Sequence, residues 1–315
     1  MGGNLKMLPK FPTIANKPVI IHPDKGRAVV SFSHGSSKKA AVITSKTRDV
    51  TVSNIDAKLS SRSVLFQGLP GCTDNEVISC RLITGGSLVD CAMGGVKNLV
   101  IQDCGCDVPT TTFGLFYLGG RRGIDRPNEN VRLIKCWSAG SIHEHILRAH
   151  NTNGLFIAEC DFQNPQHASW QRKNGACLNL RDVKHVSVEG SRGSGQVIIG
   201  PLADADGGIN LPPGPERDRM LGLRCEDVLI DDFELAGYII IEAGTRNITL
   251  RNMRGRLEGS NTLITLEKAY GPREIPREVT IENCHFTGSK SAKFLSGKAT
   301  KHVVRNSTFN GKVVK

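Results

Sequence analysis

Short runs of alternating apolar and polar residues recur along most of the chain. In each run, β-branched or other large apolar residues fill alternate positions, and the run ends in Asn, Asp or a small residue, often followed by Cys. A period of two is typical of a strand with one buried face. The ten copies read VTVSN, VISC, LVIQDC, VRLIKC, LFIAEC, VSVEGS, VLIDDF, ITLRNM, VTIENC and VVRNS.

The spacing of these copies is irregular. The interval is 20 residues between Ile230 and Leu250 but 42 between Val188 and Ile230. Helical repeats keep a fixed length, whereas a solenoid of stacked strands accepts loops of different lengths. The pattern therefore predicts strands stacked one per turn. The matching positions are Val52, Ile78, Ile101, Leu133, Ile157, Val188, Ile230, Leu250, Ile281 and Val304.

Each copy is preceded by a second strand pattern and followed by a shorter third one. The preceding strands read SVLFQG, GSLVDC, GLFYLG, HILRAH, CLNLRD, YIIIEAG, TLITLE and KFLSG, and the third pieces include residues 284–286 and 308–309. Three strands per turn predict an all-β fold, a right-handed single-stranded parallel β-helix of about ten to eleven rungs. At about 4.8 Å per rung this is a rod on the order of 45 Å long. AVVSFSHG and AAVITS indicate a further rung. We expect a basic arm over residues 1–18 and the β-helix over 19–315.

The Asn and Cys positions acquire roles in this fold. Asn54, Asn252, Asn283 and Asn306 are expected at one sharp corner of different rungs, where stacked amides bond to one another. Cys104, Cys136, Cys160 and Cys284 follow one position later and point inward. Parallel neighbours in register have poor disulfide geometry, so the ten cysteines are interpreted as buried apolar side chains made in a reducing cytosol.

Composition and charge narrow the function classes. No apolar run approaches the ~20 residues of a membrane span, and the first residues do not resemble a secretory signal. Of the net charge of +11, residues 1–48 hold nine Lys/Arg against one acid and residues 287–315 hold seven against none, so the middle is mildly acidic. This distribution argues against a general nucleic-acid binder. It favours basic termini that contact an acidic partner. The alternative explanation is that these basic residues only keep the protein in solution.

The preceding strands supply a candidate binding face, called the first sheet. The residue after the last inward position of each strand predicts one column: Gln67, Leu118, Arg148, Arg181, Glu242, Glu267 and Ser296. Arg148 and Arg181 are expected about 5 Å apart on successive rungs. Two cations at that distance favour a ligand carboxylate or phosphate, or an internal partner such as Glu144 or Asp182.

Two loops add candidates. Trp170, Arg172 and Lys173 precede Arg181, and a Trp beside basic residues suits sugar stacking or covers a core edge. Glu144 with His145 forms a candidate acid/base pair, so Arg148, Arg181, Glu144 and His145 are the catalytic candidates.

The sequence predicts no metal site and no cofactor. The pattern His143-x-His145 lacks a third ligand. Asp204 and Asp206 suggest calcium only weakly, because the later ligands of a calcium loop are missing.

The repeat resembles the right-handed β-helix superfamily of pectate lyases, polygalacturonases and phage tailspikes over about residues 19–310. The resemblance is architectural. Asn151-Thr152-Asn153-Gly154 matches the first polygalacturonase motif except that Asn153 replaces its Asp, and an amide is no general acid or base. Arg273 to Arg277 has the wrong spacing for the pectate lyase motif.

The first functional hypothesis is a phage virion component: a tailspike, receptor-binding or capsid-decoration protein. It is expected to be a homotrimer made in the host cytoplasm that contacts other virion proteins through its basic termini. The second is a polysaccharide lyase or hydrolase acting along the first sheet, in which case the protein is secreted. The third is a non-catalytic carbohydrate-binding module. An acidic polysaccharide is the ligand expected at Arg148 and Arg181.

Overall fold

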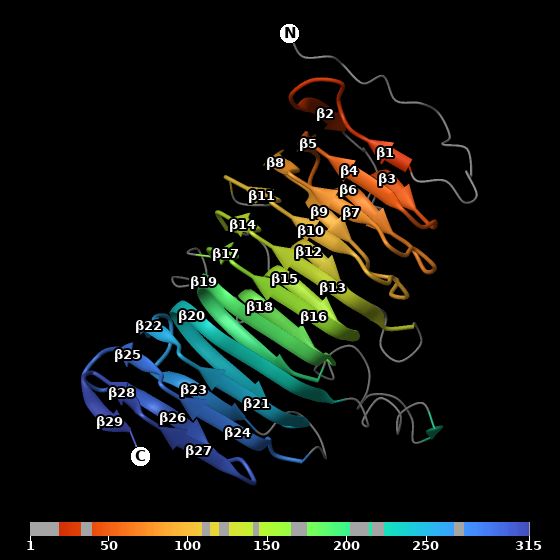
Figure 1. The fold of residues 1–315 in the computed structure, drawn as a ribbon. Helices are drawn as coiled ribbons and strands as arrows, with labels where there is room; N and C mark the ends of the chain where they lie inside the picture. Colours follow the sequence, from red (N-terminus) through yellow and green to blue (C-terminus); the bar gives the residue numbers. More distant parts are fainter. Residues whose placement is uncertain are drawn as a thin grey trace.

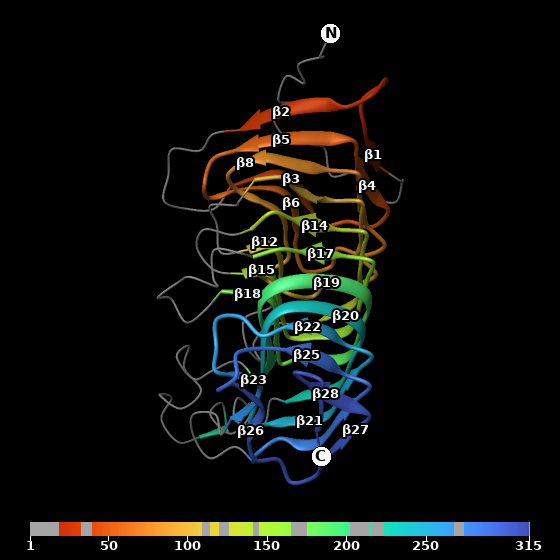
Figure 2. The same cartoon turned by 90° about the vertical axis from the view of Figure 1, so that its left-hand side faces the viewer.

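Alternating apolar residues bury one side of each strand, and the strands wind into a right-handed parallel β-helix with three sheets (Figures 1 and 2). The computed structural model describes residues 19–32, 40–108, 114–119, 126–140, 145–164, 175–201, 214–215, 224–267 and 274–314. The basic segment 1–18 lies outside these residues. Within the described residues no helix is long and apolar enough to cross a membrane.

The first sheet stacks the strands that precede each repeat. Neighbouring strands are parallel and paired in register, as in the match of Phe116 with Val89 and of Leu147 with Leu178. Its strands are β3 (Ala40–Ser45), β6 (Ser63–Gly68), β9 (Ser87–Asp90), β12 (Gly114–Leu118), β15 (His145–His150), β18 (Ala176–Arg181), the last parts of β19 (Lys184–Gly200) and β20 (Cys225–Glu242), β23 (Thr262–Glu267) and β26 (Lys293–Gly297).

The second sheet holds the repeat itself. Its strands are β1 (Val19–Ile21), β4 (Val50–Ser53), β7 (Glu76–Ile78), β10 (Val100–Gln102), β13 (Asn128–Ile134), β16 (Thr152–Ala158), the first parts of β19 and β20, β21 (Thr245–Arg251), β24 (Arg277–Glu282) and β27 (His302–Arg305). These are eleven stacked segments in the described part of the chain.

The third sheet holds the short strands after the corner. Its strands are β2 (Ala28–Phe32), β5 (Ile55–Leu59), β8 (Arg81–Thr84), β11 (Gly105–Cys106), β14 (Trp137–Ser138), β17 (Asp161–Phe162), the middle parts of β19 and β20, β22 (Arg254–Arg256), β25 (His285–Thr287) and β28 (Ser307–Phe309). β29 (Lys312–Val314) pairs antiparallel with β28.

The corner between the second and third sheets has the same backbone conformation in successive rungs. Asn54, Asn252, Asn283 and Asn306 occupy it as predicted, each with φ between 47° and 56°. Asn283 donates its side-chain N–H to Asn252 Oδ1 (3.2 Å), so part of the predicted amide ladder is present. The register also places Ser79, Asp103, Lys135, Glu159, Gly190 and Asp232 at this corner, all with positive φ. The non-glycine residues adopt this left-handed conformation at a cost on the order of 1 kcal/mol each.

The register corrects one repeat position and adds one strand. Val52 pairs with Val77, not with the predicted Ile78. The inward residue stands two positions before the corner residue, which here is Ser79, so the alternation buries Val77 completely and leaves Ile78 half-buried. The long interval before Ile230 contains a first-sheet segment that the sequence reading missed: residues 196–200 pair with β18.

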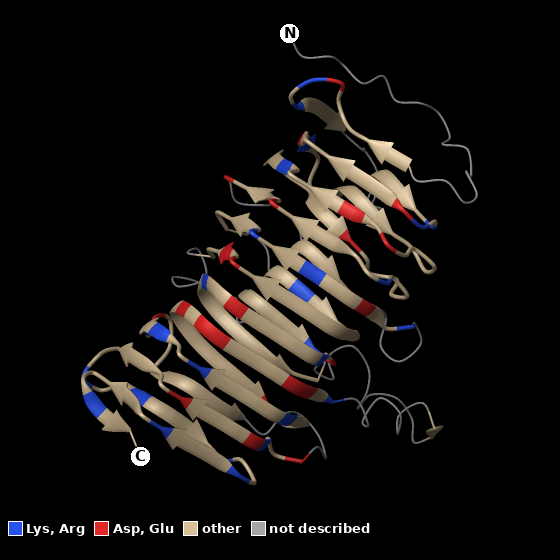
Figure 3. Cartoon of the chain, viewed as in Figure 1, with Lys and Arg blue, Asp and Glu red and all other residues tan. Residues whose placement is uncertain are grey.

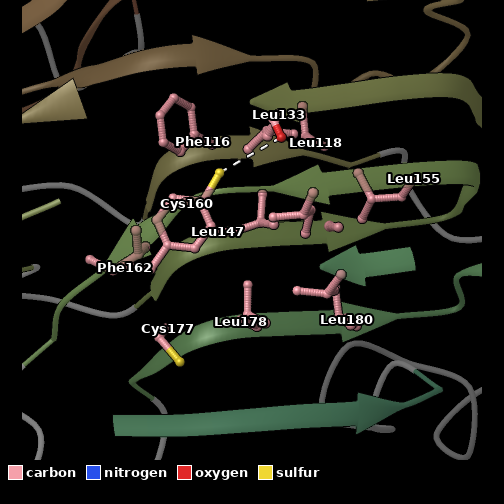
Figure 4. Packing of buried hydrophobic residues seen from close by; sticks show 14 of the residues in the cluster. Phe116, Leu118, Leu133, Leu147, Leu155, Cys160, Phe162, Cys177, Leu178 and Leu180 are labelled. Carbon is pink, nitrogen blue, oxygen red and sulfur yellow. Dashed lines mark hydrogen bonds between the residues drawn. The ribbon is translucent and has the colours of Figure 1, made fainter. Parts of the chain in front are cut away.

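The core between the three sheets is a column of apolar side chains that includes cysteines (Figure 4). All ten cysteines are buried and free, which confirms their interpretation as core residues. Cys80, Cys104, Cys136 and Cys160 stack directly after the corner, and the backbone N–H of Cys80 donates to Cys104 Sγ (3.3 Å). Burial raises the pKa of the Cys177 and Cys225 thiols to about 12, so they stay protonated and apolar.

Candidate functional site

The outer face of the first sheet carries a row of polar side chains, half of them buried and half of them half-buried. Strand alternation sends Phe116, Leu147 and Leu178 into the core and Tyr117, Arg148 and Asn179 to the opposite side. The next outward position of the same strands holds His150 and Arg181. We call the following set the polar row: Gln67, Asp90, Tyr117, Arg148, Asn179, His150, Arg181 and Glu242.

The structure corrects the predicted single column. Arg148 pairs with Asn179, and Arg181 pairs with His150, so the two arginines lie on neighbouring strands but two residues out of register. Gln67 and Ser296 belong to the column of Arg148, whereas Glu242 and Glu267 pair with each other in the column of Arg181. Leu118 points into the core with 0% exposure. The number of residues between the last inward residue and the end of the strand differs from strand to strand. The predicted column assumed a constant number and therefore combined residues of different columns.

Arg148 is held over an aromatic side chain. Its guanidinium carbon lies 5.1 Å from the centre of the Tyr117 ring, and its Nε donates to His150 Nε2 (3.1 Å). The rings of Tyr117 and His150 meet edge to face at 5.8 Å. Tyr117 and Arg148 are half-buried, while His150 is 2% exposed. These contacts orient the guanidinium on the sheet before a ligand arrives.

His145 is buried at the start of β15, beside Asn179 of the polar row. The backbone N–H of Ala176 donates to its Nδ1 (3.1 Å), and its Nε2 lies 2.8 Å from the side-chain amide nitrogen of Asn179. The residue is 5% exposed. The ring is therefore buried and its Nδ1 accepts a backbone hydrogen bond, which favours a positioning role for His145 over the acid/base role proposed from the sequence.

Arg181 forms an ion pair with Glu242 across an intervening strand. Its Nε donates to Asn179 Oδ1 (2.9 Å), and its Nη1 donates to the carbonyl of Pro201 (3.1 Å) and to Glu242 Oε2. The side chains of Arg181 and Glu242 are only 10% and 13% exposed.

The glycine between them makes this contact possible. Gly200 pairs with Arg181 on the neighbouring strand, and a Cβ at Gly200 would stand 2.6 Å from Glu242 Oε2. Because Gly200 has no side chain, the carboxylate of Glu242 lies over it and reaches Arg181. A guanidinium held by an amide oxygen, a backbone carbonyl and a carboxylate is engaged inside the protein, so Arg181 anchors the row.

Several predicted residues cannot be placed on the row. Glu144, Trp170, Arg172 and Lys173 lie outside the described residues, as do Asp204 and Asp206 of the calcium hypothesis. Glu267 is different, because its backbone on β23 pairs with Glu242 and so continues the column of Arg181. Among the residues that the structure describes, no three His, Cys, Asp or Glu side chains gather as metal ligands do.

The spacing of the two carboxylates of the polar row excludes them as a hydrolytic pair. Asp90 and Glu242 stand five strand spacings apart on the first sheet, on the order of 24 Å. Glycoside hydrolases place their two carboxyl groups about 5 to 9.5 Å apart. These two residues therefore do not form such a pair.

Tyr117, Asn179 and Gly200 are residues of the site that sequence reasoning missed. Two of them carry a recognisable signal, because Tyr117 and Asn179 interrupt apolar runs at the outward position of a strand. Gly200 has no such signal in the sequence, since its role depends on Glu242, 42 residues further along the chain.

Comparisons with known proteins give structural likeness only. No protein-family model matches the sequence, and no curated protein matches it. Solved structures of similar shape include the catalytic domain of a GH87 alpha-1,3-glucanase in complex with tetrasaccharides, with 14% identity, a TM-score of 0.44 and coverage of 92% of this chain and 56% of the glucanase chain. A mutant tailspike protein of E. coli bacteriophage HK620, in complex with a pentasaccharide, has 12% identity, a TM-score of 0.46 and coverage of 92% and 59%. PfbA, a surface adhesin of Streptococcus pneumoniae, has 9% identity, a TM-score of 0.41 and coverage of 94% and 74%.

The chain spans less than two thirds of the glucanase and tailspike chains. At these identities and TM-scores the likeness carries no argument about function.

Proposed function

We propose that the protein binds an extended glycan along the polar row of the first sheet. The observation that carries this proposal is the row itself: polar side chains occupy outward positions of five successive strands, β6 to β18, about 4.8 Å apart, and of β20. Gln67, Tyr117, Arg148 and Glu242 are half-buried and therefore within reach of a ligand. A linear polymer of sugars matches such a repeat, because it offers hydroxyls and ring faces at regular intervals. The internal contacts of Arg148 and Arg181 hold the row in place, which lowers the entropy cost of binding.

The chemistry of Arg148 suggests an acidic glycan as the first ligand to test. A guanidinium binds a carboxylate with two parallel hydrogen bonds, and Arg148 is half-buried beside Tyr117. Arg181 is paired with the carboxylate of Glu242.

We expect Arg148→Ala to weaken binding of a uronate polysaccharide by about tenfold or more, since a hydrogen bond to a charged group contributes about 1.5–3 kcal/mol. Affinity electrophoresis with polygalacturonate, alginate and uncharged dextran measures this. Arg254→Ala is the matched control, because Arg254 is exposed on the third sheet. Equal binding by the wild type and Arg148→Ala, or no binding of any glycan, contradicts the proposal.

A polysaccharide lyase or hydrolase has weaker support. Arg181 and His145 are engaged inside the protein, and Asp90 and Glu242 are too far apart for hydrolysis. The same glycans, incubated with the protein and assayed for new reducing ends or unsaturated ends, test turnover directly.

The virion role is the setting we propose for this binding, as a homotrimer in contact with other virion proteins. Its support is a group of exposed basic residues near the C-terminal end of the rod, where Figure 3 colours several ribbon segments blue: Lys290, Lys293, Lys298, Lys301, Arg305 and Lys312. Mass photometry of the purified chain is expected to find trimers. A stable monomer that cleaves polysaccharide would argue for the enzyme instead.

A further inference from the structure

A tryptophan lies flat on the outer face of the third sheet, away from the polar row. Trp137 belongs to β14, and its neighbour in register on β11 is Gly105. A Cβ built on Gly105 would stand 2.4 Å from Cδ2 and 2.7 Å from Cε2 of the indole. One face of the indole ring therefore lies directly against the backbone of Gly105.

The ring is fixed by a polar contact. The indole Nε1–H donates to Asp107 Oδ1 (2.9 Å), and Asp107 Oδ2 lies 3.4 Å from Nη1 of Arg81. Trp137 is half-buried although it lies on the outer face of the sheet and not in the core. An indole held flat by a hydrogen bond and a glycine is a preformed stacking surface.

Charged residues that form ion pairs with one another flank this surface. In the column of Trp137, Asp161 Oδ2 lies 2.6 Å from Nη2 of Arg192, and Asp56 contacts both Arg27 and Arg81. With Asp107 and Glu234, which is paired in register with Arg192, this group holds four carboxylates and three guanidiniums.

The balance of charge selects the ligand class. The carboxylates of this group are at least as numerous as its guanidiniums, so it has no net attraction for a polyanion, which argues against nucleic acid and acidic glycans here. They do supply hydrogen-bond donors and acceptors beside an apolar ring. We propose that Trp137 and its charged neighbours form a second carbohydrate site, which takes a neutral hexose unit of a glycan stacked on the indole.

This site is independent of the polar row, because it lies on a different sheet and shares no residue with it. The test uses a Trp170→Phe background, which leaves Trp137 as the single tryptophan of the chain. Titration with dextran, laminarin and mannan is expected to shift the Trp137 emission to the blue and to reduce its quenching by acrylamide. Trp137→Leu in the wild-type background is expected to weaken binding by about tenfold or more in affinity electrophoresis.

Two further variants separate the possible outcomes. Asp107→Asn keeps an acceptor for the indole but removes the charge that faces Arg81, and it is expected to reduce affinity less than Trp137→Leu. Arg148→Ala should leave the Trp137 response unchanged, so failure of the polar row and failure of this site are distinguishable. The proposal is overturned if no neutral polysaccharide changes the emission, if Trp137→Leu binds as the wild type does, or if single-stranded DNA gives the response instead. Circular dichroism verifies that each variant is folded.

Discussion

Replacing Glu242 by alanine is expected to reduce the free energy of unfolding by about 3–5 kcal/mol, because it leaves the buried guanidinium of Arg181 without its counter-charge. Arg181 is 8% exposed, and its remaining acceptors, Asn179 Oδ1 and the Pro201 carbonyl, are uncharged. Urea denaturation followed by circular dichroism gives the size of the loss.

Two controls identify the cause of this loss. Glu278→Ala removes an acid that faces Arg246 at 3.6 Å on the surface, where both side chains are more than half exposed, and is expected to cost less than about 1 kcal/mol. The double variant Arg181→Met/Glu242→Leu removes both charges and is expected to recover most of the stability. If Glu242→Ala is as mild as Glu278→Ala, the ion pair does not stabilise the row.

Replacing Phe162 by alanine is expected to cost about 3–5 kcal/mol, because the cavity it leaves lies in the centre of the rod. The Phe162 ring is fully buried, and its centre lies 6.1 Å from that of Phe116, so the pair joins the third sheet to the first (Figure 4). The rungs on either side share this core, which leaves little freedom to close the cavity.

Phe156 provides the matched control. It lies on the outer face of the second sheet, half-buried under the guanidinium of Arg132 at 5.4 Å and beside an open groove of about 490 Å³. Phe156→Ala is expected to cost about 1 kcal/mol, since a surface substitution loses only part of the burial. Thermal unfolding of both variants compares the two positions. Equal losses would contradict the assignment of Phe162 to the core.

The local sequence was sufficient for the fold. Apolar residues at alternate positions mark the buried face of each strand, and this pattern needs no knowledge of the neighbouring rung. Positions such as Ile157 and Ile281 are fully buried as predicted. Corner residues such as Asn283 and core cysteines such as Cys104 also stand where the repeat placed them.

The candidate site was predictable only in part. Arg148, Arg181 and Glu242 were identified from the sequence because they are charged and occupy outward positions of first-sheet strands. Their partners were not. Arg148 pairs with Asn179 and not with Arg181, and the ion pair of Arg181 crosses Gly200 to a residue 61 positions away.

For most strands the sequence by itself determined which residues face inward and where the strand turns, and it determined that the strands wind into a β-helix, because these properties depend on neighbouring residues in the chain. Only the tertiary structure decided the register between rungs. Loops of different lengths separate the strands, and backbone hydrogen bonds between rungs form whatever the side chains are. That register placed His150 beside Arg181 and the indole of Trp137 over Gly105, so the two surfaces proposed to bind glycans became visible only after folding.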